Sequence, residues 1–272
     1  MRHGKSDLWI LLALLFVASV LFLPVLFHEP RIPAIHVKQK AQLHSLDAAI
    51  ELFKNEMNAY PPSDANDPAG KPYCGAMKLT EALMGWDSLG FHSESVFRCD
   101  GLNPDTLAQL YPVNPPSDNV SARWGPYLAA ETANMWRMAD IYGEGDTGPF
   151  PKDAVVLCDV FERRRPSGKE TGMPILYYRA HRSGSTHEPG NPLNIYDCTD
   201  NRDLIALGVP GKSGKTHPLL DPQRFYLNTQ NDRSSTPEPW QCDSYILISA
   251  GKDGLYGTAD DIYNFPWKYR EQ

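Results

Sequence analysis

The first long pattern in the chain is an uninterrupted apolar run at residues 8–27, LWILLALLFVASVLFLPVLF, which contains no charged residue and no side-chain amide. A helix of this length, at about 1.5 Å per residue, spans the ~30 Å hydrocarbon layer of a membrane. A cleaved signal peptide and a buried helix are the alternatives, but the apolar segment of a signal peptide is usually only ~7 to 15 residues long. The run therefore predicts a retained transmembrane helix, preceded by a cytoplasmic tail at residues 1–7.

Helical periodicity resumes after a proline-rich break at residues 28–36, where Pro30 and Pro33 oppose a continuous helix. Apolar side chains then recur at spacings of three and four, while charged side chains occupy the other faces. This pattern predicts an amphipathic helix at residues 37–60 that ends before Pro61. The apolar stripe consists of Leu43, Leu46, Ile50, Phe53, Met57 and Tyr60.

The remainder, residues 61–272, alternates between loops and short apolar runs, and the chain's 24 prolines and 20 glycines favour long loops. Short helices are predicted at residues 78–86 and 129–142. Runs rich in β-branched and aromatic residues predict strands at residues 154–161, 174–180 and 244–250, with shorter candidates at 203–207 and 224–227. The predicted fold is α+β: a long N-terminal helix, first transmembrane and then amphipathic, packs on a mostly antiparallel β-sheet with long loops.

Charge and cysteine placement narrow the class of protein. The formal net charge of -7 and the lack of a dense basic face argue against a nucleic-acid partner. All five cysteines follow the apolar run without a CxxC motif, which suits an oxidising compartment with up to two disulfides, Cys74 with Cys99 being the most local pair. Reduced thiols remain the alternative. We expect a single-pass membrane protein whose domain after the span lies in an oxidising, extracytoplasmic compartment.

Motifs for nucleotide binding and catalysis are weak. In GVPGKSGKT, residues 208–216, the first glycine is one place away from the spacing of a phosphate-binding P-loop, and the following HPLLDP cannot begin a long helix. We expect a surface loop there and no nucleotide. There is no G-x-S-x-G elbow and no recognisable pairing of Cys with His, so we expect no catalytic residues and no enzyme.

The strongest candidate for a site is SAGKDGLYGTADDIYN, residues 249–264. Its glycines permit a tightly folded backbone, and Asp253, Asp260 and Asp261 supply hard oxygen ligands that suit Ca²⁺. The spacing does not match an EF-hand loop. Residue types alone leave two interpretations open, a calcium-binding loop and a glycine-rich hairpin whose aspartates cap backbone N–H groups.

The order of these features resembles the pseudopilins of type II secretion systems, in particular the major pseudopilin family, general secretion pathway protein G. The similarity covers about the first 60 and the last 25 residues. ELFKNEMNAYPPSD, at residues 51–64, is similar to the end of that family's spine helix, and WGPYL, at 124–128, to its Gly-Tyr-Leu segment. ISAGKDGLYGTADDIYNF, at 248–265, is similar to its closing calcium loop. The chain departs from the family where Lys5 follows Gly4, in the prolines of residues 28–36 and in its longer ectodomain.

The resemblance implies a membrane-anchored, pseudopilin-like structural subunit of a type II secretion or type IV pilus-like assembly. It also implies a single-pass inner-membrane protein whose C-terminal domain lies in the periplasm or extracytoplasmic space. Its partners would be other pilin-like subunits, secretion-system inner-membrane components and membrane lipid. Carried over to this sequence, the calcium ligands are Asp253 and Asp260, with Asp261 as a second choice and Ser249 and Leu255 as main-chain contributors. The alternative function is a membrane-tethered extracytoplasmic binding module for a glycan or protein partner, which would use the aromatic loops of residues 120–200.

Overall fold

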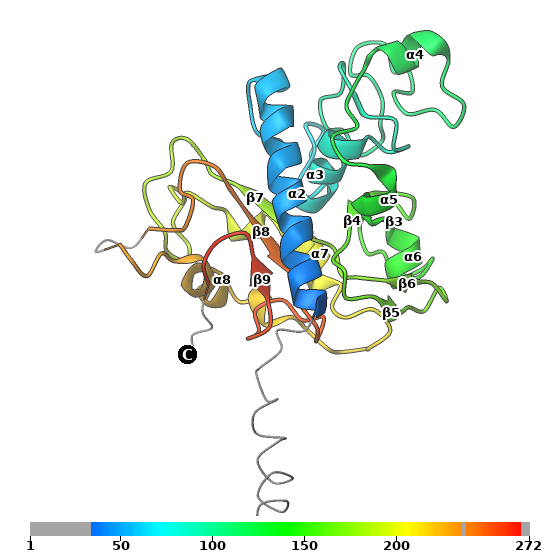
Figure 1. The fold of residues 1–272 in the computed structure, drawn as a ribbon. Coiled ribbons are helices and arrows are strands. Elements are labelled where there is room, and N and C mark those ends of the chain that lie inside the picture. Colours follow the sequence, from blue (N-terminus) through cyan, green and yellow to red (C-terminus); the bar gives the residue numbers. More distant parts are fainter. Residues whose placement is uncertain (1–33, 235–237, 268–272) are drawn as a thin grey trace, which may run out of the picture. The chain divides into compact units, whose positions relative to one another are not determined.

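The computed structural model of the chain describes residues 34–234 and 238–267. The chain divides into two units, Met1–Val37 and Lys38–Gln272, and the second contains the core and all the sheets. Its fold is α+β, with short helices and small antiparallel sheets (Figure 1). The α-helices are α2 (Ala34–Met57), α3 (Gly75–Met84), α4 (Ser117–Ser121), α5 (Ala130–Ala133), α6 (Met138–Tyr142), α7 (Arg202–Ala206) and α8 (Pro222–Thr229), with 3₁₀ turns η1 (Cys198–Asn201) and η2 (Pro218–Leu220).

The strands pair only with antiparallel neighbours. Three two-stranded sheets join β1 with β2, β3 with β4 and β5 with β6, and a three-stranded sheet has the order β7-β8-β9. The strand bounds are β1 Phe91–His92, β2 Arg123–Trp124, β3 Met135–Arg137, β4 Val155–Leu157, β5 Arg163–Arg164, β6 Glu170–Thr171, β7 Leu176–Arg179, β8 Tyr245–Ser249 and β9 Ile262–Tyr263.

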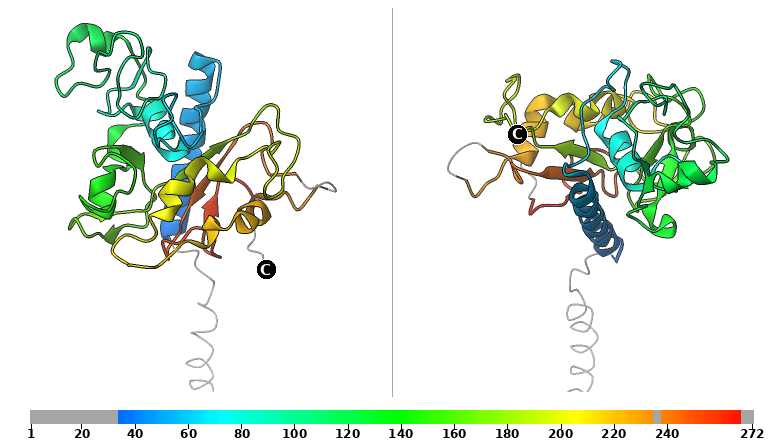
Figure 2. Two further views of the ribbon diagram at one scale, coloured as in Figure 1. Left: turned by 180° about the vertical axis from the view of Figure 1, so that it is seen from behind. Right: turned by 90° about the horizontal axis from the view of Figure 1, so that it is seen from above.

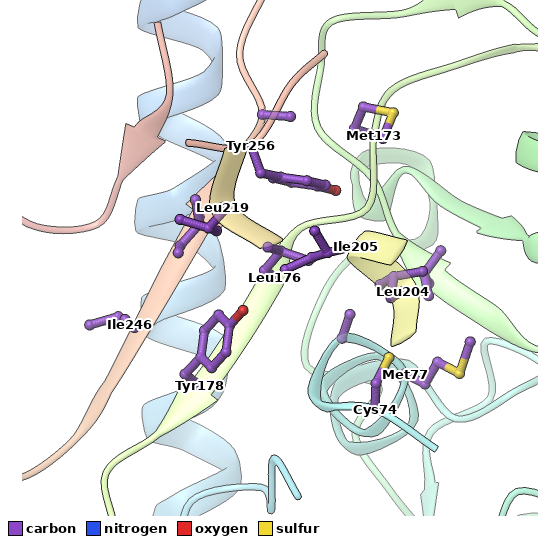
Figure 3. Close-up of a cluster of buried hydrophobic side chains, with 14 of the residues drawn as sticks. Cys74, Met77, Met173, Leu176, Tyr178, Leu204, Ile205, Leu219, Ile246 and Tyr256 are labelled. Atoms are coloured by element: carbon purple, nitrogen blue, oxygen red, sulfur yellow. The ribbon is translucent and has the colours of Figure 1, made fainter. Parts of the chain in front are cut away.

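The three-stranded sheet is covered on both faces. Tyr245 and Leu247 of β8 pack with Leu43, Leu46 and other residues of α2. Their neighbours in β8 point to the opposite face and belong to the core that includes residues of α7 and α8. Figure 2 shows α2 on one side of this sheet and α8 on the other, and Figure 3 shows side chains of the second core. Because a sheet buried on both faces favours apolar residues at successive positions, residues 245–248 of β8 form a continuous apolar run rather than an alternating one.

Helix α3 lies at the centre of the unit, and all ten of its residues are buried. Its first residue, Gly75, approaches the sheet so closely that a Cβ atom there would lie 2.3 Å from the Tyr177 carbonyl oxygen. Farther along the helix, the Thr80 hydroxyl accepts a hydrogen bond of 2.9 Å from the N–H of Leu157 in β4. The helix therefore links the β3-β4 pair of strands to the three-stranded sheet.

The predicted fold and location need correction. Within residues 34–234 and 238–267, no helix is long and apolar enough to cross a membrane, and several small sheets take the place of one mostly antiparallel sheet. The long transmembrane helix packed on a sheet, and with it the single-pass inner-membrane location, are therefore contradicted. The span predicted at residues 8–27 and its cytoplasmic tail lie outside the described residues. The amphipathic helix predicted at residues 37–60 corresponds to α2, which spans Ala34–Met57. This helix begins inside the proline-rich break that was predicted at residues 28–36.

Two short strand predictions are wrong because local helix signals prevail. Residues 224–227 lie in α8, which begins at Pro222 after the N-cap Asp221, whose carboxylate accepts a hydrogen bond from the N–H of Gln223. Residues 203–207 overlap α7, in which Leu204 and Ile205 are buried. The single helix predicted at 129–142 is also wrong, because Asn134 adopts a left-handed conformation between α5 and β3.

Candidate metal-binding loop

The candidate loop connects β8 to β9 and closes the three-stranded sheet. Ser249 pairs with Ile262 at its base, and Gly251 has a φ of +63°, a conformation that favours glycine. A Cβ atom on Gly251 would lie 2.1 Å from the Asp260 carbonyl oxygen, so the two ends of the loop are in contact. In the middle of the loop, Tyr256 is fully buried and its hydroxyl donates to the Pro174 carbonyl. Figure 3 shows its ring close to Leu219 and Ile205.

Four residues of the loop bring oxygen atoms together. Asp260 Oδ2 accepts a hydrogen bond of 2.8 Å from the N–H of Asp253, and Asp260 Oδ1 accepts one of 2.7 Å from the Thr258 hydroxyl. The same hydroxyl lies 3.2 Å from the Leu255 carbonyl oxygen. Asp253 Oδ1 accepts a hydrogen bond of 2.7 Å from the N–H of Leu255. The result is one cluster of two carboxylates, one hydroxyl and one carbonyl.

The two carboxylates influence each other. Burial raises the pKa of Asp253, the charge and the close contact of Asp260 raise it further, and the Leu255 N–H and the Thr258 hydroxyl act in the opposite direction. Two carboxylates in contact repel each other unless a proton or a cation lies between them. A divalent cation would relieve this repulsion while both groups stay ionised.

The other two predicted ligands have different partners. The Ser249 hydroxyl is buried and donates a hydrogen bond of 2.9 Å to Asp159 Oδ2. Asp261 Oδ2 accepts hydrogen bonds from the N–H of Gly257, at 2.7 Å, and from the Tyr263 hydroxyl, at 3.2 Å. Burial raises the pKa of Asp261 well above its ordinary value, and its Oδ1 has no hydrogen-bond partner. The structure thus brings together Asp253, Asp260 and Leu255, and leaves Ser249 and Asp261 to hold the base of the loop.

Sequence reasoning missed two residues of this arrangement. Thr258 contributes a hydroxyl between the carboxylates, and its place two residues before Asp260 in a glycine-rich turn is the available signal. Asp159 is fully buried and accepts hydrogen bonds from the N–H groups of Met173, at 3.0 Å, and Phe161, at 3.2 Å. Nothing in the local sequence indicates that Asp159 meets Ser249, 90 residues later.

The donor set consists of oxygen atoms, which suit hard divalent cations such as Ca²⁺. Calcium accepts carboxylate, carbonyl and hydroxyl oxygens in flexible arrangements, whereas zinc and other transition metals prefer nitrogen or sulfur. The part of the chain that the structure describes contains no group of three or more His, Cys, Asp or Glu side chains placed to hold a metal ion. A calcium ion at this loop would therefore be held by Asp253 and Asp260, with the Leu255 carbonyl and the Thr258 hydroxyl completing the protein ligands.

The cysteines do not form the predicted local disulfide. All five, including Cys74 and Cys99, are free thiols. Burial raises the pKa of Cys74 to about 11, which leaves it protonated and unreactive at neutral pH. The structure therefore assigns Cys74 to the core, where it packs with Met77 (Figure 3).

Comparison with known proteins adds no relative: the chain matches no family model, no curated protein and no solved structure.

Proposed function

We propose that this chain is a pilin-like structural subunit that assembles with other pilin-like subunits, and that Ca²⁺ binding to the loop at residues 249–264 stabilises its fold. The observation that supports this most strongly is the combination of α2, packed along the three-stranded sheet, with the oxygen cluster of Asp253, Thr258 and Asp260 in the turn that closes the same sheet. The resemblance of both segments to the major pseudopilin family supports the same function.

Helix α2 offers a surface for assembly. Its inner face is buried by Leu43, Leu46 and Phe53, whereas Leu52 keeps 52% of its surface exposed. An exposed leucine on a regular helix suits packing against the helix of a neighbouring subunit. The proposed contact is therefore between helices, with the sheets facing outward from the assembly.

Photocrosslinking tests the proposed assembly. A photoreactive residue at Leu52 of the full chain, expressed in its native cells, should give adducts with pilin-like proteins, because the helix face would lie in the contact. The matched control is Val113, which is 96% exposed in a loop outside α2. Mass spectrometry identifies the adducts. The proposal fails if Leu52 gives no pilin-like adduct while the protein is present at its normal level.

Thermal unfolding tests the calcium part separately. Excess Ca²⁺ at about 100 times its Kd should raise the Tm of the full chain by roughly 5–10 °C relative to chelator, because a ligand bound only by the folded state stabilises it by about 2.7 kcal/mol. Asp253→Asn and Asp260→Asn should each abolish most of this shift. Asp105→Asn, which alters an exposed carboxylate in another loop, should retain it. Equal melting curves with and without Ca²⁺ would refute the calcium site.

A binding module for a glycan or protein partner is the second candidate, favoured by exposed apolar side chains within residues 86–128, a segment that overlaps only the start of the predicted aromatic loops at 120–200. Trp124 is 44% exposed, Leu107 is 64% exposed and Val113 is 96% exposed. The same crosslinking experiment separates the two functions. Adducts with a single non-pilin protein from Val113, and none from Leu52, would favour the binding module.

A further inference from the structure

Three consecutive arginines, at residues 163–165, form strand β5 and the residue that follows it. Strands β5 and β6 pair antiparallel, with Arg163 opposite Thr171 (Figure 1). The exposure of the three side chains alternates, because successive residues of a strand point to opposite faces: Arg165 is buried, Arg164 is exposed and Arg163 is half-buried. Arg163 and Arg165 therefore lie on the face of the β5-β6 hairpin that packs on the rest of the molecule.

The guanidinium of Arg163 lies against the loop at residues 249–264. A Cβ atom on Gly254 would lie 3.6 Å from Arg163 Nη1 and 3.7 Å from Arg163 Cζ. Gly254 stands directly between Asp253 and Leu255, which are two of the proposed calcium ligands. Since adjacent Cα atoms are about 3.8 Å apart, this cation lies within roughly 10 Å of the oxygen cluster.

The packing of the hairpin on the loop is fixed from two sides. The same Cβ atom on Gly254 would lie 3.6 Å from Cγ of Met173, a buried residue just after β6. The N–H of Met173 donates a hydrogen bond of 3.0 Å to Asp159 Oδ1, and Asp159 Oδ2 accepts one of 2.9 Å from the Ser249 hydroxyl. Asp159 thus holds the hairpin and the base of the loop together, so the position of Arg163 belongs to a packed contact.

Arg163 nevertheless makes no bond to the loop. Among the described residues, its guanidinium forms neither a hydrogen bond nor an ion pair. Other arginines of the chain are directly paired, as Arg123 is with Asp87 at 3.2 Å. The influence of Arg163 on the loop is therefore that of a charge at a distance of several ångströms, and the shape of the loop does not depend on a bond to it.

A positive charge in this place acts in opposite directions on the metal-free and the calcium-bound loop. Without a metal ion it attracts the carboxylates of Asp253 and Asp260 and offsets part of their mutual repulsion. With Ca²⁺ in place it repels a double positive charge. Both effects favour the metal-free state, and both become weaker when salt screens the charges.

We propose that Arg163 sets the calcium affinity of the loop, as a cation that stabilises the metal-free state and weakens binding of the divalent ion. The inference rests on the proposed calcium site and adds a residue outside the loop that regulates it. The number of charged ligands tunes the calcium affinity of a protein site. Two carboxylate ligands and a nearby cation both favour a weak site, which fills only where calcium is abundant.

Calorimetric titration of the full chain with Ca²⁺ at low ionic strength tests the proposal. Arg163→Gln should bind Ca²⁺ about threefold to tenfold more tightly than the unaltered chain, because it removes the charge beside the cluster. Arg163→Lys keeps that charge and should bind within about twofold of the unaltered chain. Arg164→Gln is the matched control, because it removes the same charge from the same strand but from an exposed side chain on the opposite face. Its affinity should also stay within about twofold.

The direction of the change separates this role from a purely structural one. Loss of packing between the hairpin and the loop would weaken calcium binding in Arg163→Gln, whereas loss of the charge tightens it. At about 0.5 M salt the affinities of Arg163→Gln and the unaltered chain should converge. The Tm of each variant in chelator verifies that it is folded.

Two results would overturn the role of Arg163 while leaving the calcium site in place: equal or weaker binding in Arg163→Gln, or the same gain in Arg164→Gln. A lack of saturable Ca²⁺ binding in both the unaltered chain and Arg163→Gln would refute the calcium site itself, and this role with it.

Discussion

Asp159 illustrates how one side chain can organise a site without belonging to it. Its carboxylate is fully buried and accepts hydrogen bonds from the Ser249 hydroxyl and from two backbone N–H groups. These bonds hold the base of the candidate loop against the segment before β5. Burial raises its pKa to about 6, although these hydrogen bonds act in the opposite direction. The folded protein therefore pays a cost to ionise Asp159 that the unfolded chain does not.

This cost predicts a specific pH dependence. Because the pKa of Asp159 is higher in the folded than in the unfolded chain, its contribution to stability is fully present below about pH 4 and is lost as the pH rises through about 6. Asp159→Asn keeps similar hydrogen bonds without the charge. Between pH 4 and 7 the free energy of unfolding should fall less in the Asp159→Asn variant than in the unaltered chain. The difference between the two falls should reach about 3 kcal/mol.

Urea unfolding at several pH values checks this, and the difference between the two proteins cancels the titration of all other groups. His187 and His217, whose pKa values burial lowers to about 4, titrate in both proteins alike. Parallel stability curves for Asp159→Asn and the unaltered chain would contradict the assignment.

At the scale of elements, α2 shows a clear division between a packed and an open face. Leu46 is 1% exposed and packs with the apolar side chains of the three-stranded sheet, whereas Leu52, less than two turns later, is half exposed. The amphipathic spacing in the sequence predicts the packed face, because burial repeats with the helical period. Other short elements are less predictable, as α8 shows, where the N-cap at Asp221 and Pro222 outweighs a strand-like composition.

The two leucines make a matched pair for a stability test. Leu46→Ala should lower the free energy of unfolding by about 2–5 kcal/mol, because it removes buried methyl groups and leaves a cavity. Leu52→Ala should change it by no more than about 0.5 kcal/mol, since both variants carry the same small gain in helix propensity and only Leu46→Ala loses packing. Chemical denaturation measures both. Similar losses for the two would mean that α2 does not pack on the sheet as described.

At the scale of the whole molecule, residues far apart in the chain meet around the three-stranded sheet. Strands β7 and β8 are neighbours although about 65 residues separate them, and helices α7 and α8 and the turn η2 come from the intervening segment. Tyr256, in the loop between β8 and β9, donates its N–H to Nδ1 of His217, and the two rings are tilted with their centroids 4.7 Å apart.

The sequence by itself determined the features that depend on local spacing. Periodic apolar residues indicated α2, β-branched and aromatic runs indicated the regions of β4, β7 and β8, and the density of Asp and Gly indicated the loop that contains Asp253 and Asp260. Such features are visible because a helix turn or a strand repeat is set by residues only a few positions apart.

Only the tertiary structure decided which side chains meet. It placed the Thr258 hydroxyl between the two carboxylates and turned Ser249 toward Asp159. These contacts depend on long-range packing, in which burial, charge and hydrogen bonding are settled together across segments that no local pattern connects. The physical reason is that a pKa, an ion pair or an unpaired donor is a property of its surroundings, and the surroundings exist only once the chain has folded.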